Sequence, residues 1–253
     1  MYSDPWYVWV RWSLWGPSTV LLGALIAHMW RRGLHREYPA FTLCASWCVV
    51  RFFIAFFLHT SGYYMAYFNF HFYADALEAT VLVFVAAELY RKLFQNLEGL
   101  RALGRLLFRW TTVIMLLIAA MAAAAKSNND LDRVWALLTQ VDIGCKLLVG
   151  GIIFFLFLFS SYFGVPWRRY SIAIAVGVAL YMTVGVLDRS AVAIFGKLAN
   201  HTVTVVDDSA YLCMTLIWFV YLRLPERIVT PPSRSPAHNL DKWNATLQEL
   251  LAR

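Results

Sequence analysis

The sequence contains few charged residues for its length, and this shortage excludes most classes of soluble protein. Of its 253 residues, only 15% are charged and 60% are hydrophobic. A typical soluble domain is about 25% charged and about 45–50% apolar. Because helices satisfy their own backbone hydrogen bonds in lipid, the composition predicts an all-α integral membrane protein with the lipid bilayer as its first partner.

The sequence also lacks the patterns that disulfide, metal and catalytic sites require. Its four cysteines, Cys44, Cys48, Cys145 and Cys213, all lie in apolar segments, without the spacing of a secreted disulfide framework. They are interpreted as small buried hydrophobic residues. No nucleophile–base pair, paired haem-type histidines or phosphate-binding loop is present. We therefore expect no metal and no cofactor. The absence of a catalytic motif also disfavours an enzyme.

Seven apolar segments are long enough to cross a bilayer, whose hydrocarbon core requires about 20 residues of helix. They cover residues 13–30, 40–59, 73–94, 109–125, 136–163, 169–190 and 204–223. The pattern predicts a seven-transmembrane helix bundle over residues 1–224. Residues 225–253 are expected to form a tail, with a proline-rich linker and a short amphipathic helix at 239–252.

The distribution of Lys and Arg predicts the orientation of this bundle. Fifteen of the 22 basic residues fall in loops on one side of the membrane and five on the other, leaving Arg51 and Lys146 inside segments. Because basic loops stay in the cytoplasm, the N-terminus is predicted outside and the C-terminus in the cytoplasm. The net charge of +7 is thus a topology signal rather than a sign of nucleic-acid binding. The predicted location is the plasma membrane, and the compact loops are typical of a bacterial inner membrane.

Two stretches outside the segments carry further patterns. The aromatic stretch from Tyr63 to Tyr73 is expected to be a loop that forms either an interfacial belt or a lid over an outer cavity. The stretch 91–109 alternates leucines with basic residues and suits a short interfacial helix or a docking face.

The fifth segment contains an acidic and a basic residue, whose insertion into lipid costs free energy unless the two are paired. A central Asp or Lys costs about 2.5–3.5 kcal/mol of insertion free energy. Asp142 and Lys146 are four residues apart with the acid first, the better order for an ion pair on one helix. Ionisable groups within a membrane are candidates for a functional site.

Other helices place polar groups at a similar depth. A rise of about 1.5 Å per residue puts Asp142, Lys146, Glu78 and Asp208 all in the outer half of the bundle. Tyr181 belongs to the sixth helix, and Tyr211 follows Asp208 on one face of the seventh. The predicted ligand-binding residues are Asp142, Lys146, Asp208, Tyr211, Tyr181 and Glu78, around an outward-facing polar cavity.

A second pair is expected deeper in the bundle. Arg51 lies near the middle of the second segment, and Glu88 lies in the inner half of the third. On the same ruler Arg51 lies about midway between the levels of Glu78 and Glu88, about 7 Å from either and within reach of a long guanidinium side chain. The sequence predicts a structural ion pair between Arg51 and Glu88, and the alternative is a switch in which Arg51 exchanges partners.

These patterns favour a receptor-like sensor that binds a small polar or cationic ligand and signals through a separate cytoplasmic partner. The alternative is an ion- or proton-coupled transporter of small solutes, in which the Asp142–Lys146 pair alternates with substrate or proton. A membrane enzyme or cofactor-binding protein is the third hypothesis, which the absence of a catalytic motif disfavours. A cytoplasmic protein partner and a homo-oligomer are both compatible with the amphipathic helix at 239–252.

Overall fold

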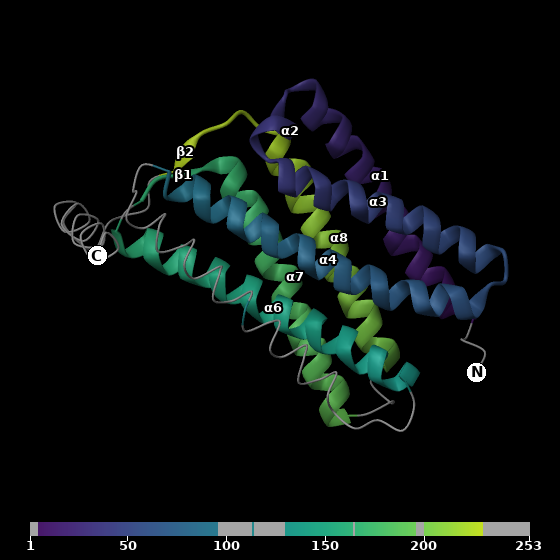
Figure 1. Ribbon diagram of the computed structural model, residues 1–253. Helices are drawn as coiled ribbons and strands as arrows, with labels where there is room; N and C mark the ends of the chain where they lie inside the picture. Colours follow the sequence, from purple (N-terminus) through teal and green to yellow (C-terminus); the bar gives the residue numbers. More distant parts are fainter. Residues whose placement is uncertain (1–4, 96–112, 114–129, 164, 196–199, 230–253) are drawn as a thin grey trace.

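The protein is described by a computed structural model that places residues 5–95, 113, 130–163, 165–195 and 200–229. Nearly all of this part of the chain is helical (Figure 1). The elements are α1 (Pro5–Arg31), α2 (Leu34–Glu37), α3 (Pro39–Thr60), α4 (Tyr64–Leu93), α6 (Asp130–Phe163), α7 (Arg169–Phe195) and α8 (Asn200–Arg223), with two-residue strands β1 (Trp167–Arg168) and β2 (Ile228–Val229).

Six of the seven predicted segments lie within or nearly within the long helices α1, α3, α4, α6, α7 and α8. The fourth, 109–125, lies outside the described residues except for position 113. The stretch 91–109 beyond Gln95 and the tail helix at 239–252 also lie outside them.

Three helices begin more than one turn before their apolar segments, by six to nine residues. Helix α1 begins at Pro5, α4 at Tyr64 and α6 at Asp130. The expectation of an aromatic loop from Tyr63 to Tyr73 was therefore wrong, because this stretch forms the first turns of α4. Hydropathy reports the cost of transfer into lipid, whereas a helix continues wherever its backbone hydrogen bonds are favourable.

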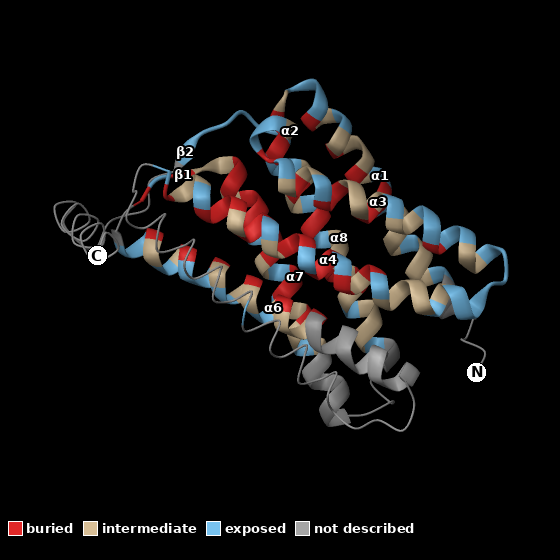
Figure 2. Cartoon of the chain, viewed as in Figure 1, coloured by how far each residue is buried: buried red, intermediate tan, exposed pale blue. Residues whose placement is uncertain are grey.

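The six long helices form a closed ring. Each packs on its neighbours in the order α1, α3, α4, α6, α7, α8, and α8 returns to contact α1. A smaller contact between α4 and α7 crosses the ring. Buried residues lie along the faces that the helices turn towards one another (Figure 2). This order brings α1 and α8 together although they are far apart in the sequence.

Four stretches are long and apolar enough to cross a membrane: Pro39–Thr60, Asp142–Tyr162, Arg169–Asp188 and Thr202–Arg223. Large apolar side chains on the outside of these helices are exposed, among them Leu43, Phe53, Phe57, Phe154 and Leu187. Such a belt would be unfavourable in water and is favourable in hydrocarbon. The protein is an all-α, multi-pass membrane protein that contacts the lipid bilayer.

The apolar core fills the half of the ring nearer to α2, β1 and β2. Trp218 of α8 is almost fully buried and packs edge-on against Phe41 of α3, with ring centroids 4.8 Å apart. Its indole N–H donates a 3.4 Å hydrogen bond to the carbonyl oxygen of Ile174 on α7. Leu22, Leu25 and Met29 of α1, Leu82 and Val85 of α4, and Met182 and Met214 complete this layer.

Polar contacts join the segments at this end of the ring. Strand β1 pairs with β2 antiparallel, and Arg168 bonds Glu226 at 2.5 Å and Glu37 at 3.4 Å. The buried Tyr38 shares a 3.0 Å hydrogen bond with Ser171. Burial raises the pKa of Tyr38 to about 12, so its hydroxyl stays protonated at neutral pH. The connections after α1, before α7 and after α8 are thereby fastened together.

Glu88 of α4 provides the N-terminal cap of α3. The first N–H groups of a helix have no partner within the helix. The backbone N–H groups of Ala40 and Phe41 donate to the two carboxylate oxygens of Glu88, at 3.4 and 3.2 Å. The helix dipole favours a negative charge at this position. Glu88 therefore positions α3 against α4.

The close approach of Gly177 to Trp218 predicts a strict requirement for glycine. A Cβ added at Gly177 would lie 2.4 Å from Nε1 of Trp218, which its packing against Phe41 prevents from moving away. We expect Gly177→Ala to lower the free energy of unfolding by about 1–3 kcal/mol, the usual cost of overpacking. Thermal unfolding in detergent measures this change.

Gly151→Ala is the matched control, because a Cβ at Gly151 meets no atom within 4 Å. Its unfolding midpoint should equal or slightly exceed that of the wild type. Equal midpoints for the two variants would contradict the close packing of α7 on α8.

Candidate functional site

A cavity of about 290 Å³ occupies the half of the ring away from β1 and β2. All six long helices contribute to its wall. The lining residues are Arg11, Trp15 and Thr19 of α1; Cys48, Arg51 and Phe52 of α3; His71, Asp75 and Glu78 of α4; Lys146 of α6; Tyr181, Gly185 and Asp188 of α7; and Val203, Thr204, Asp207, Asp208 and Tyr211 of α8.

The helical repeat explains why these residues share one cavity. Side chains three, four and seven residues apart lie on the same face of a helix. On α4 the lining residues are His71, Asp75 and Glu78, and on α7 they are Tyr181 and Gly185 with Asp188. Each helix thus turns one polar stripe towards the centre of the ring.

Asp142 and Lys146 form the ion pair that their spacing predicts. The ammonium nitrogen of Lys146 lies 3.0 Å from Oδ2 of Asp142. Lys146 lines the cavity, whereas Asp142 is 3% exposed and is not among the lining residues. Gly185 of α7 lies beside the lysine, and a Cβ there would make an ordinary van der Waals contact with its side chain at 3.6 Å. Asp142 therefore acts on the cavity through Lys146.

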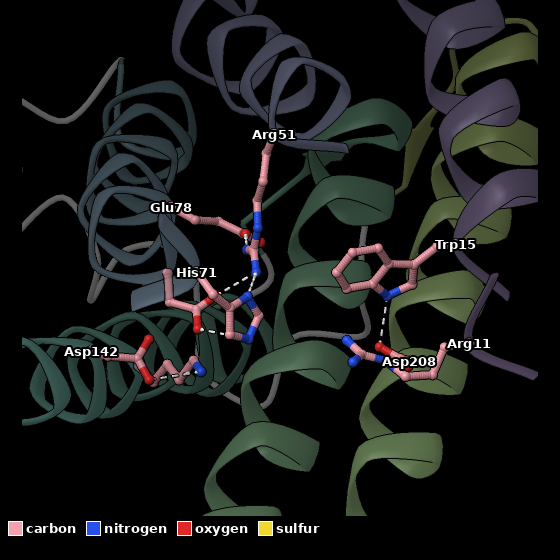
Figure 3. A network of polar contacts seen from close by, with 9 residues as sticks. Arg11, Trp15, Arg51, His71, Glu78, Asp142 and Asp208 are labelled. Atoms are coloured by element: carbon pink, nitrogen blue, oxygen red, sulfur yellow. Dashed lines mark hydrogen bonds and ion pairs between the residues drawn. The ribbon is translucent and has the colours of Figure 1, made fainter. Parts of the chain in front are cut away.

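Arg51 is the centre of a partly buried network formed by α3 and α4. Its guanidinium bonds Glu78 through Nη1, and Nη2 lies 2.5 Å from Oδ1 of Asp75 (Figure 3). The expected pair with Glu88 is wrong, because Glu88 caps α3 instead. Ten residues separate Glu78 from Glu88, which rotates Glu88 by about 80° around α4 and off the cavity face.

His71 lies between Arg51 and Asp75. Nη2 of Arg51 lies 3.2 Å from Nδ1 of His71, and Nε2 of the same ring faces Oδ2 of Asp75 at 3.5 Å. Because an arginine can only donate, the tautomer that satisfies both contacts accepts at Nδ1 and carries its proton on Nε2. The imidazole thus links Arg51 to Asp75.

A third ion pair joins the two helices that close the ring. Oδ2 of Asp208 lies 3.2 Å from Nε of Arg11, and Oδ1 accepts a 2.7 Å hydrogen bond from the indole N–H of Trp15 (Figure 3). The guanidinium of Arg11 also lies 4.9 Å from the centre of the Trp15 ring, within the range of a cation–π contact. Asp208 is 5% exposed, so both of its oxygens are satisfied away from bulk water.

The cavity ends at the apolar core. Directly below Tyr181 and Tyr211 along the two helices lie the buried Val178, Met214 and Trp218. Among the described helices, the layer around Trp218 fills the ring between the cavity and the β1–β2 end. In the described part of the chain, this apolar layer therefore separates the polar cavity from the β1–β2 end of the ring.

Five of the six ligand-binding residues predicted from the sequence line this cavity: Lys146, Asp208, Tyr211, Tyr181 and Glu78. The sixth, Asp142, lies behind Lys146. The predicted ligand-binding residues did not include Arg11, Trp15, His71, Asp75 or Asp207, which also line the cavity. The spacing of His71, Asp75 and Glu78 at four and three residues is the signal that would have grouped them.

The shared guanidinium of Arg51 predicts a large stability effect. Arg51→Met leaves Glu78 and Asp75 without their cation inside the ring, and breaking a buried pair costs about 3–5 kcal/mol. We expect a correspondingly lower thermal unfolding midpoint in detergent. Adding Glu78→Gln to this variant should recover part of the loss.

Arg91→Met serves as the control, because Arg91 is an exposed base near the end of α4. A surface substitution of this kind changes stability by less than about 0.5 kcal/mol. If Arg51→Met were as mild as Arg91→Met, the network around Arg51 would not stabilise the ring.

Comparisons with known proteins were negative at every level: no family model matches the chain, and neither the curated proteins nor the solved structures contain a match.

Proposed function

We propose that the chain is a receptor-like sensor in the plasma membrane, with seven transmembrane helices, its N-terminus outside and its C-terminus in the cytoplasm. In this proposal a small polar ligand enters the cavity from outside, and a separate cytoplasmic partner receives the signal. The observation that carries the proposal is a polar cavity that the apolar layer around Trp218 closes on one side.

The distribution of charge supports the orientation. Arg31, Arg32, Arg36, Arg91, Arg223 and Arg227 are exposed at the end that carries α2, β1 and β2. Basic residues flanking transmembrane helices remain on the cytoplasmic side. This assignment places the cavity in the outer half of the membrane.

The packing below the cavity supports a route for the signal. Tyr181 and Tyr211 line the cavity, and their rings lie 5.9 Å apart in an edge-to-face contact between α7 and α8. One to two turns below, Gly177 and Trp218 join the same two helices in close contact. Because packed helices shift as rigid units, a ligand that moves α7 against α8 would move their cytoplasmic ends.

An ion- or proton-coupled transporter is the second candidate. The cavity contains several carboxylates and the exchangeable contacts of Arg51, His71 and Asp75. Such groups carry protons in pumps and carriers. A carrier, however, has to open a polar path past Trp218 for its substrate. A sensor needs no such path.

A variant that fills the cavity tests the ligand site. Gly185→Leu places a branched side chain beside Lys146 and inside the cavity wall. A panel of small polar compounds is screened by thermal shift, using purified protein in detergent. For compounds that stabilise the wild type, binding should weaken about tenfold or more in the variant, which corresponds to 1.4 kcal/mol.

Gly151→Leu is the control and should bind as the wild type does, because Gly151 faces open space. The same compounds are then tested for flux into proteoliposomes. A sensor produces no flux. Uptake that requires a proton gradient and disappears in Lys146→Ala would replace the sensor with the carrier.

The proposed orientation is tested by cysteine labelling in intact cells. In a background without the native cysteines, Ser61→Cys lies in the exposed turn between α3 and α4, and Arg36→Cys lies on the exposed surface of α2. A membrane-impermeant maleimide should label position 61 directly and position 36 only after permeabilisation. The reverse pattern would invert the topology and place the cavity on the cytoplasmic side.

A further inference from the structure

The ion pairs of the cavity determine which charge its ligand can carry. The described lining residues include two arginines and one lysine, and a carboxylate engages each of them. Arg11 bonds Asp208, Lys146 bonds Asp142, and Arg51 bonds Glu78 and Asp75. An anionic ligand would have to displace one of these carboxylates within a region of low dielectric constant, which is costly.

The described lining residues include five carboxylic acids but only two arginines and one lysine. Arg51 alone faces two of these acids, Glu78 and Asp75. Asp207 of α8 also lines the cavity, and it forms no hydrogen bond or ion pair with the residues that the structure describes. The carboxylate of Asp207 is therefore available to bind a positively charged group of a ligand in the cavity.

Aromatic rings surround the same space. Tyr211 follows Asp207 by four residues on α8, so the two side chains share a face of that helix. Tyr181 of α7 meets Tyr211 edge to face, and Phe52 and Trp15 complete the aromatic lining. The faces of aromatic rings attract ammonium groups by about 0.5–2 kcal/mol, most strongly where water is excluded.

We propose that the cavity binds a small organic ammonium ion, with its charged nitrogen at Asp207 and its apolar part against Tyr181 and Tyr211. The inference rests on the proposed role of the cavity as a ligand site and adds the chemical class of the ligand. A cation balances the carboxylate charge without breaking any of the four ion pairs made by Arg11, Lys146 and Arg51. A neutral ligand leaves that charge unbalanced, and an inorganic cation makes no use of the aromatic walls.

The test compares three probes of nearly equal shape: benzylamine, benzyl alcohol and benzoate. Binding to the purified full-length protein in detergent is measured by isothermal titration calorimetry at neutral pH. We expect benzylamine to bind about tenfold or more tightly than benzyl alcohol, a difference of at least 1.4 kcal/mol. Benzoate should bind more weakly than either.

Two substitutions locate the ammonium group. Asp207→Asn should weaken benzylamine about tenfold or more and leave benzyl alcohol unchanged, whereas Asp207→Glu keeps the carboxylate and should keep most of the affinity. Glu37→Gln removes an exposed acid of α2, outside the cavity, and is the matched control. A loss in Glu37→Gln as large as in Asp207→Asn would overturn the assignment to Asp207. Thermal unfolding shows that each variant is folded.

The outcomes separate this inference from the proposed function. If benzyl alcohol or benzoate binds as tightly as benzylamine, and Gly185→Leu abolishes that binding, the cavity is a ligand site but not for ammonium ions. If the wider panel contains ligands of the cavity and benzylamine does not bind, the ammonium inference alone fails. If no compound binds, the sensor proposal fails with it.

Discussion

The structure depends on the pairing of basic side chains inside the bundle with carboxylates. Arg51 shares its guanidinium between Glu78 and Asp75. Lys146 pairs with Asp142 on its own helix, and Arg11 pairs with Asp208. Because an unpaired ion in a low-dielectric interior is expensive, these contacts constrain which faces of the helices can turn inward. The cavity lies where those faces meet.

The ring divides into two layers of different physical character. The polar layer lies around the cavity, and the apolar layer lies around Trp218 and Phe41. Beyond the apolar layer, Arg168 fastens the connections near α2 and after α8 through Glu37 and Glu226. This arrangement fits a ligand site that is coupled mechanically to the opposite end. It fits a permeation path less well, because the tight contact of Gly177 with Trp218 lies across the route.

Part of the site was predictable because helical periodicity and depth are local properties of a sequence. Lys146, Tyr181, Asp208, Tyr211 and Glu78 were placed together from their spacing and their distance from the helix ends, and all five line the cavity. The same method paired Arg51 with Glu88 and was wrong. A rise per residue defines the level of a side chain but not the direction in which it points, and Glu88 is turned towards the start of α3.

The amino-acid sequence by itself determined the all-α membrane class, the approximate positions of the described helices and the pair formed by Asp142 and Lys146. These features follow from composition and from contacts within single segments. Only the tertiary structure decided that α8 closes the ring against α1, so that Arg11 meets Asp208 across 197 residues of sequence. It also decided that Arg51 bonds Glu78 and that Asp207 lines the cavity, because the rotation of each helix is set by all of its neighbours together.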